Sequence, residues 1–240
     1  MDTVTTKENN TIEQMFEAGA HFAYSKTRRH PTASPYIFGA KDMVEIFDLE
    51  KTKGLLDDAR TFVASLAREG KQVLFVAGKN EARGVVSATA LSLDMPYVTS
   101  RWIGGTLTNF SEIKKRIERL ETLASEKESG ELAKKYTKRE QLLLTREIES
   151  LSETFGGLTP MKTLPAALFV VDTERESIAV EEAKKAGIPI IALMNSDCDV
   201  ADATYPILAN DGSVKSITFF VESIAAAYRE NKGVIKKTEE

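Results

Sequence analysis

This 240-residue chain has few of the side chains that enzymes most often use as neutral-pH general bases or thiol nucleophiles: two histidines and one cysteine. The two histidines, His21 and His30, lie in one polar segment, far along the chain from the one cysteine. That cysteine, Cys198, stands between Asp197 and Asp199, and nearby carboxylates raise the pKa of a thiol and make it less reactive. Neither a G-x-S-x-G elbow nor an H-E-x-x-H zinc motif occurs. We therefore expect no catalytic centre.

Motifs for nucleotide cofactors are absent as well, since the sequence has no G-x-G-x-x-G and no G-x-x-x-x-G-K-[ST]. The segment Gly78–Gly84 carries Lys79 and Arg83 before a predicted helix, so it can bind an anion or serve as an ordinary solvated turn. Carboxylates that could hold a divalent cation occur at Asp172 and in the cluster of Asp197, Asp199 and Asp202. Such clusters are more often polar loops at a sheet edge, and we expect no cofactor and no metal.

A basic segment near the N-terminus, residues 18–41, contains no Asp or Glu but four cations: Lys26, Arg28, Arg29 and Lys41. Within it, Pro31 and Pro35 favour an irregular, extended arm over residues 19–35. Because no acid repels phosphate in this segment, it suits contact with a nucleic acid even though the net charge of the chain is −4. The alternative is a solvated basic loop without a partner.

A second stretch without acids, residues 95–111, holds Arg101 directly before the only tryptophan, Trp102. Two adjacent glycines follow and let a backbone pass close to another surface; hydroxyl and amide groups come next at Thr106, Thr108 and Asn109. Such a set can stack on a base and hydrogen-bond phosphate. In the other interpretation, Trp102 anchors the core and Thr108 or Asn109 caps the next helix. The two interpretations are compatible.

Apolar runs that alternate with amphipathic segments predict the elements that must position these residues. Short strands are expected at 36–38, 44–47, 73–77, 97–99, 167–171, 188–193 and 206–208. Helices are expected at 11–19, 51–69, 81–93, 176–186 and 213–229. Strands that are apolar throughout and alternate with helices form a parallel sheet covered on both faces. The predicted fold class is therefore α/β, with a doubly wound parallel sheet.

The middle of the chain departs from this alternation. One apolar stripe at helical spacing runs from Phe110 to Leu123 and a second from Leu144 to Phe155, with a polar link at 125–131. We expect an antiparallel coiled-coil helical hairpin over residues 108–155, inserted into an α/β domain made of residues 1–107 and 156–240. The alternative is a pair of ordinary surface helices packed on the sheet.

The composition agrees with a globular protein of a reducing compartment. Apolar residues make up 42% and charged residues 28% of the chain, and no apolar run reaches the ~18 residues that a membrane-spanning helix needs. Residues 1–10 are polar and include no apolar signal region. A single cysteine excludes an internal disulfide, so we expect a cytoplasmic location.

Four segments of the chain form a recognisable set. The most specific is Arg101-Trp102-Ile103-Gly104-Gly105-Thr106-Leu107-Thr108-Asn109. The others are Glu17-Ala18-Gly19-Ala20-His21-Phe22, then Pro35-Tyr36-Ile37-Phe38-Gly39-Ala40-Lys41 with Asp48-Leu49-Glu50-Lys51-Thr52, and finally Phe155-Gly156-Gly157-Leu158 with Leu164-Pro165-Ala166-Ala167-Leu168-Phe169-Val170-Val171-Asp172. Together they resemble the bacterial form of the ribosomal small-subunit protein S-two family, over about residues 11 to 229.

The resemblance implies a flavodoxin-like α/β domain with a protruding coiled-coil hairpin. It implies a structural constituent of the small ribosomal subunit in translation, ribosome-bound and without catalytic activity. Its partners would be small-subunit ribosomal RNA and neighbouring ribosomal proteins, among them the large messenger-binding protein S-one, with no membrane and no small-molecule substrate. The predicted RNA-binding residues are Lys26, Thr27, Arg28, Arg29, His30, Lys41, Lys79, Arg83, Arg101, Trp102, Thr106, Thr108, Asn109 and Lys114.

Two positions depart from the family pattern. His-Phe-Gly-His is replaced here by His21-Phe22-Ala23-Tyr24, and Asp-Thr-Asn-x-Asp-Pro by Asn195-Ser196-Asp197-Cys198-Asp199-Val200. A tyrosine phenol, with a pKa near ~10, is a poor substitute for a second imidazole, so we expect no tight zinc site there. Two other functions remain open: an enzyme or sensor that binds an anion at Gly78–Gly84 and Asp172, and a free scaffold that docks proteins on its hairpin.

Overall fold

The computed structural model describes residues 11–233, except for the side chain of residue 133. The polar segment 1–10, for which we expect no signal sequence, lies outside the described residues. Residues 11–17 are helical and end at Gly19, whose φ of +73° is the left-handed conformation that glycine adopts at the end of a helix. This first helix agrees with the sequence prediction.

The centre of the molecule is a five-stranded parallel sheet of order β5-β4-β6-β7-β8. Pairs such as Phe75 with Phe169 on β4 and β6, and Leu193 with Ile207 on β7 and β8, fix its register. The predicted strands are confirmed to within about two residues at each end. Their bounds are β4 Val73–Val76, β5 Tyr97–Val98, β6 Ala167–Val171, β7 Ile190–Met194 and β8 Tyr205–Leu208.

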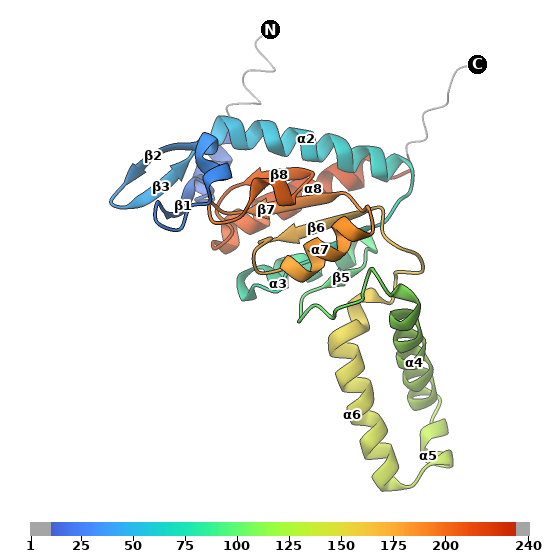
Figure 1. The fold of residues 1–240 in the computed structure, drawn as a ribbon. Coiled ribbons are helices and arrows are strands. Elements are labelled where there is room, and N and C mark those ends of the chain that lie inside the picture. Colours follow the sequence, from blue (N-terminus) through green and yellow to red (C-terminus); the bar gives the residue numbers. More distant parts are fainter. Residues whose placement is uncertain (1–10, 234–240) are drawn as a thin grey trace, which may run out of the picture.

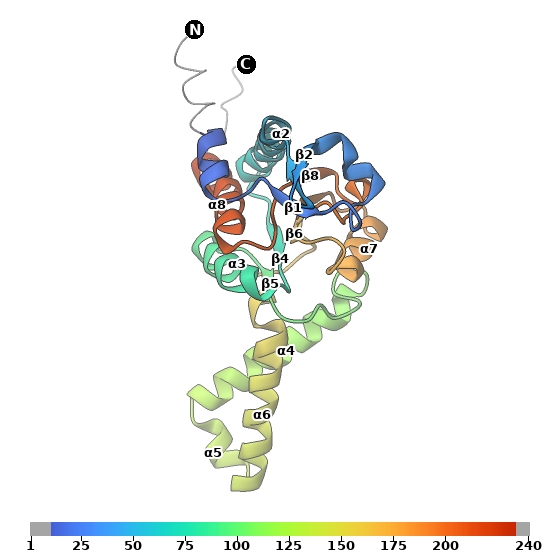
Figure 2. The ribbon, with the colours of Figure 1, turned by 90° about the vertical axis from the view of Figure 1, so that its left-hand side faces the viewer.

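Helices cover both faces of this sheet, as the unbroken apolar strands predict (Figure 2). Alternate residues of each strand point to opposite faces, so Phe75 and Phe169 enter one core while Leu74 and Leu168 enter the other. The first core is closed by three helices: α2 Leu49–Arg68, α3 Asn80–Leu93 and α8 Val214–Asn231. The second is closed by α7 Ser177–Lys185 and by segments described below. The fold is thus the expected flavodoxin-like α/β class.

A small antiparallel sheet of order β1-β3-β2 lies beside the main sheet (Figure 1). Its strands are β1 Phe22–Ser25, β2 Ile37–Lys41 and β3 Val44–Phe47, and a 3-10 helix, η1 Pro31–Tyr36, leads into β2. The prediction of an irregular arm is therefore wrong. Contacts that the local sequence does not reveal order this segment: Ala33 is fully buried, and the backbone N–H of His30 donates to the carbonyl of Ser196 at 2.7 Å.

Two long helices project from the α/β part of the molecule (Figure 1). They are α4 Phe110–Glu128 and α6 Lys138–Phe155, and a short helix, α5 Glu131–Lys135, connects them. The turn lies inside the polar link predicted at 125–131, at Gly130 with φ +72°, although α4 continues through the first part of that link to Glu128. Arg119 on α4 forms a two-bond ion pair with Glu147 on α6, at 3.1 and 3.2 Å.

The base of the helical pair is packed into the second core. Ile113 and Ile117 of α4 and Phe155 of α6 join Trp102 and Leu158 in that cluster. The apolar stripe of α4 is buried from Ile113 to Leu123, whereas most of the α6 stripe is only half-buried. The base of the pair is therefore continuous with the α/β core. None of the helices in the described part of the chain is both apolar enough and long enough to cross a lipid bilayer.

Candidate functional site

The carboxyl ends of the parallel strands place several predicted residues at one edge of the sheet. Lys79 follows β4, and its ammonium group contacts Asp172, after β6, at 2.7 Å and Asp211, after β8, at 2.6 Å. Asn195, after β7, donates to the other oxygen of Asp211 at 2.9 Å. Asp211 is fully buried. This polar cluster ties the ends of four strands together.

Lys79 is therefore engaged inside the protein. Burial works against its charge, yet Asp211 and Asp172 outweigh burial and raise the pKa of Lys79 above its usual range. Removing one partner from such a buried pair leaves an uncompensated charge, which strongly destabilises a fold. The amine is a structural cation in this arrangement, and its prediction as an RNA contact stays a prediction.

The segment Arg101–Asn109 is built around one buried carboxylate, Glu182, on α7. The Trp102 indole donates to Oε1 of Glu182 at 3.1 Å, and the Gly105 N–H donates to the same oxygen at 2.7 Å. Oε2 accepts from the N–H of Leu107 at 2.9 Å and from the N–H and hydroxyl of Thr108, each at 3.2 Å. Burial raises the pKa of Glu182, but these hydrogen bonds outweigh it and lower that pKa below its usual value.

These bonds decide which groups of the segment reach solvent. Trp102 and Thr106 are buried, and the Thr106 hydroxyl donates to the carbonyl of Ile103. Arg101, Thr108 and Asn109 are exposed. Gly105 has φ +93°, which only glycine adopts without strain, so the turn that leads into α4 needs it. The structure thus gives Trp102 the core-anchoring position, and RNA contact by the segment remains a prediction, with Arg101 its most available cation.

The arm residues lie next to the end of β7. Arg28 pairs with Asp197 at 3.1 Å and its guanidinium lies 4.1 Å from the centre of the Tyr24 ring. Arg29 pairs at 2.7 Å with the buried Glu45 of β3. Lys26 and Thr27 are exposed, while His30 is half-buried at the start of η1. Half-exposed Arg28 is therefore more available to a phosphate than Arg29.

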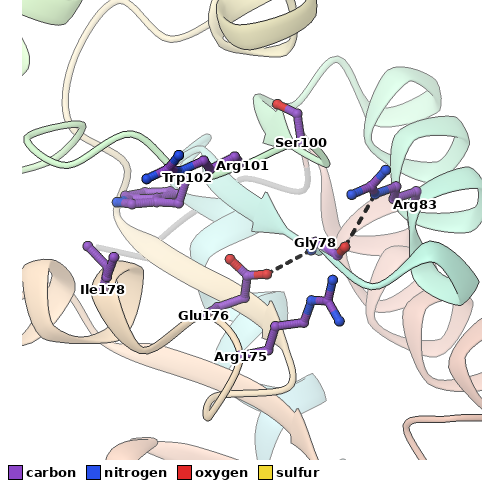
Figure 3. Close-up of a pocket in the computed structure, with 8 residues that line it drawn as sticks. All are labelled: Gly78, Arg83, Ser100, Arg101, Trp102, Arg175, Glu176 and Ile178. Atoms are coloured by element: carbon purple, nitrogen blue, oxygen red, sulfur yellow. Dashed lines mark hydrogen bonds between the residues drawn. The ribbon is translucent and has the colours of Figure 1, made fainter.

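A cavity of about 320 Å³ opens at the same edge, among the loops that follow β4, β5 and β6 (Figure 3). Three arginines line it: Arg83 of α3, Arg101 after β5, and Arg175 in the turn after β6. Its floor includes Gly78, whose N–H donates to Glu176 at 2.9 Å. In the described part of the chain, none of the three guanidinium groups forms an ion pair with a carboxylate. Glu176 also lines the cavity, so three cations face one carboxylate there, and this excess of positive charge suits an anionic ligand.

Two predicted residues stand away from this edge. Lys41 ends β2 at the tip of the small sheet, and Lys114 lies on α4. Sequence reasoning missed Arg175, because a lone arginine in a polar turn gives no signal of its own. It also missed Glu182, although a carboxylate between Ala179 and Ala183, on the apolar stripe of a helix, indicates a buried acid with partners.

The environment of the single thiol makes it unreactive at neutral pH. Cys198 is buried, and burial raises the pKa of its thiol to about 12, more than the nearby Asp172 and Asp197 do. A thiolate is the reactive form, so this cysteine is a poor nucleophile at neutral pH. The expectation of an inert thiol agrees with this environment, with burial as the larger cause.

The side chains considered as metal ligands have other contacts within the protein. His21 stacks on Phe16, with ring centres 4.4 Å apart, and lies tilted against Phe22 at 4.1 Å, and burial lowers its pKa. The loop carboxylates contact cations or hydroxyls: Arg28 for Asp197, Thr32 for Asp199 and Lys184 for Asp202. Over residues 11–233, no three His, Cys, Asp or Glu side chains gather where they could hold a metal ion.

Comparison with known proteins finds matches that cover most of the chain. The sequence profile of the family described as Ribosomal protein S2 matches residues 15–231. A protein of Chloroherpeton thalassium is 41% identical over 229 residues, which cover 95% of this chain and 91% of that protein. One of Salinispora arenicola is 41% identical over 90% of this chain and 78% of its own length, and one of Chlorobium phaeobacteroides is 42% identical over 89% and 84%. All three carry the name small ribosomal subunit protein uS2.

Proposed function

The chain belongs to the ribosomal protein S2 family, whose members are structural rather than enzymatic, and from this premise we propose that it binds small-subunit ribosomal RNA and helps neighbouring ribosomal proteins to dock. Protein S-one is among those neighbours in the proposal. The protein works ribosome-bound and in the cytoplasm. The hairpin, residues 108–155, acts as a second unit that reaches away from the α/β domain.

One observation supports RNA binding most strongly. The carboxyl edge of the sheet carries Arg101, Arg83 and Arg175 around one cavity, with no carboxylate paired to them in the described residues. Elsewhere on this edge, Lys79 and Arg29 already have buried acidic partners. A cation without a carboxylate partner gives up no ion pair when it contacts phosphate, so these arginines are the favoured contacts, although Arg83 also donates to the carbonyl of Gly78 at 3.3 Å.

The rival functions lack such support. An anion-binding enzyme would need catalytic groups beside the cavity, and family membership favours a structural protein. A free scaffold would use the helical pair alone and leave the arginine cavity without a role.

The proposal is tested with Arg101→Ala. The side chain is exposed and makes no ion pair, so the variant should fold like the wild type. Binding to small-subunit ribosomal RNA is measured by filter retention at several salt concentrations. We expect weaker binding and a salt slope reduced by the ~0.9 of one phosphate contact.

The matched control is Arg229→Ala, an exposed arginine in the last turn of α8. It removes the same charge from the whole protein, and the proposal predicts little change in RNA affinity. Equal affinities and equal salt slopes for Arg101→Ala and wild type would count against the proposed contact.

A further inference from the structure

The cavity in Figure 3 lies at a special point of the sheet. The strand order is β5-β4-β6-β7-β8, so the chain places β5 on one side of β4 and then crosses to build β6 on the other side. Where strand order reverses in an open α/β sheet, the loops diverge and leave a crevice outside the carboxyl ends, which is where such sheets bind ligands. Gly78 follows β4, and Arg175 and Glu176 follow β6, so the cavity stands at this switch point.

The lining of the cavity is suited to one chemical class. Arg83, Arg101 and Arg175 supply planar guanidinium groups, which bind phosphate through paired hydrogen bonds. Ile178 supplies apolar surface on the same cavity and is 55% exposed although it is a large aliphatic residue; Trp102 also lines the cavity but is only 5% exposed. A volume of about 320 Å³ lies at the lower end of the ~300–1,000 Å³ range of small-molecule sites.

One acid, Glu176, also lines the cavity, and a hydrogen bond from the Gly78 backbone fixes its position. Glu176 is 6% exposed, and its Oε1 accepts the N–H of Gly78. A Cβ on Gly78 would collide with this carboxylate oxygen, so glycine is needed for the carboxylate to lie there. Against three cations, one carboxylate turned toward the Gly78 backbone leaves the cavity with a net positive charge.

We propose that this cavity binds the phosphate of a single nucleotide, with the three arginines around the phosphate and the nucleoside against the exposed side chain of Ile178. Ribosomal RNA as the source of that nucleotide rests on the proposed function. The cavity itself does not depend on it, because a free mononucleotide presents the same phosphate and nucleoside.

The test uses the full-length protein and three probes: adenosine monophosphate, inorganic phosphate and a short single-stranded RNA. Calorimetry measures each affinity. Trp102 is the only tryptophan of the chain and lines the cavity, so its fluorescence reports whether a probe enters there. We expect saturable binding of the mononucleotide and the RNA with a change in tryptophan emission, and weaker binding of phosphate alone.

Two variants locate the binding. Arg175→Ala and Arg83→Ala each remove an exposed side chain and should leave the fold intact. Each should weaken binding about ten-fold or more, the effect of losing one charge-assisted contact. Arg229→Ala, in the last turn of α8 and outside the cavity, should bind like the wild type.

The outcomes separate this inference from the proposed function. Binding of both mononucleotide and RNA, weakened by Arg175→Ala, supports both. Binding of the mononucleotide alone supports the cavity and contradicts RNA as its source, while binding of RNA alone with the same loss in Arg175→Ala identifies RNA as the source. The inference is overturned if no probe binds at millimolar concentration, or if the two cavity variants bind as tightly as the wild type.

Discussion

The carboxylate of Glu182 offers the sharpest test of how the segment before α4 is held. Its two oxygens each hold one fully buried donor, the indole N–H of Trp102 on Oε1 and the backbone N–H of Leu107 on Oε2. Glu182→Gln replaces one oxygen with an amide NH₂, which cannot accept a hydrogen bond. Whichever way the amide turns, one of these two buried donors loses its partner.

The expected loss of stability follows from that count. A buried donor left without a partner costs about 1–3 kcal/mol, so Glu182→Gln should lower the free energy of unfolding by about 1–3 kcal/mol. Glu182→Ala leaves both donors unpaired and should cost about 2–6 kcal/mol. For a chain of this length, ~1 kcal/mol corresponds to roughly 2–4 °C in Tm, so the glutamine variant should melt roughly 2–12 °C lower.

Glu181→Gln is the matched control, since Glu181 lies on the same helix, is exposed, and pairs with the exposed Lys185 at 3.5 Å. An exposed ion pair contributes about 0–1 kcal/mol, so this variant should melt close to the wild type. Thermal and urea unfolding, followed by circular dichroism, measure both. Equal stability of Glu182→Gln and Glu181→Gln would refute the assigned role of Glu182.

The pH dependence gives a second readout of the same carboxylate. The folded-state pKa of Glu182 is lowered, so the charged form stabilises the fold above the unfolded pKa of ~4.3 and this contribution is lost as the pH falls toward the folded value. The stability gap between wild type and Glu182→Gln should therefore be constant above about pH 5 and should narrow below about pH 4.3. A gap that widens in acid would contradict the assignment.

Three further predictions concern the rest of the fold. Gly157→Ala should destabilise the protein by about 1–3 kcal/mol in urea unfolding, because its Cβ would collide with the backbone oxygen of Tyr97. Gly156→Ala is the control and should cost far less, because its Cβ would lie 3.4 Å from the hydroxyl oxygen of Ser152. Equal effects of the two variants would contradict this. Replacing residues 121–145, which lie beyond the Arg119–Glu147 ion pair, with a short Gly/Ser linker should leave a soluble, cooperatively melting domain, and aggregation would show that the whole helical pair belongs to the core. A thiol reagent at pH 8 should modify Cys198 only after denaturant is added, and rapid labelling of the native protein would contradict the burial that raises its pKa.

The sheet could be predicted from the sequence because its strands are uniformly apolar. Ala167–Val171 and Ile190–Met194 are buried at every position, and such runs bounded by turn residues have few alternatives in an α/β chain. Their alternation with helices then fixes a parallel sheet covered on both faces. The carboxyl edge, and with it the neighbourhood of Lys79, follows from that topology.

The small sheet and the arginine cavity could not be predicted in this way. β1 and η1 form because of contacts with residues far along the chain, such as the hydrogen bond from His30 to Ser196. The local sequence pattern does not indicate such long-range contacts. Arg175 joins Arg83 and Arg101 only because the loops of three strands meet at the switch point. Trp102 had two compatible interpretations, and a buried partner on another helix, Glu182, accounts for its core position.

Assembly into the small ribosomal subunit tests the central claim most directly. The tagged full-length chain would be mixed with small subunits stripped of their loosely held proteins by salt, and then sedimented through a sucrose gradient. The account predicts that the chain moves with the subunits at one copy each, and that Arg101→Ala is released at lower salt than the wild type. A chain that stays in the soluble fraction under every salt condition would contradict it.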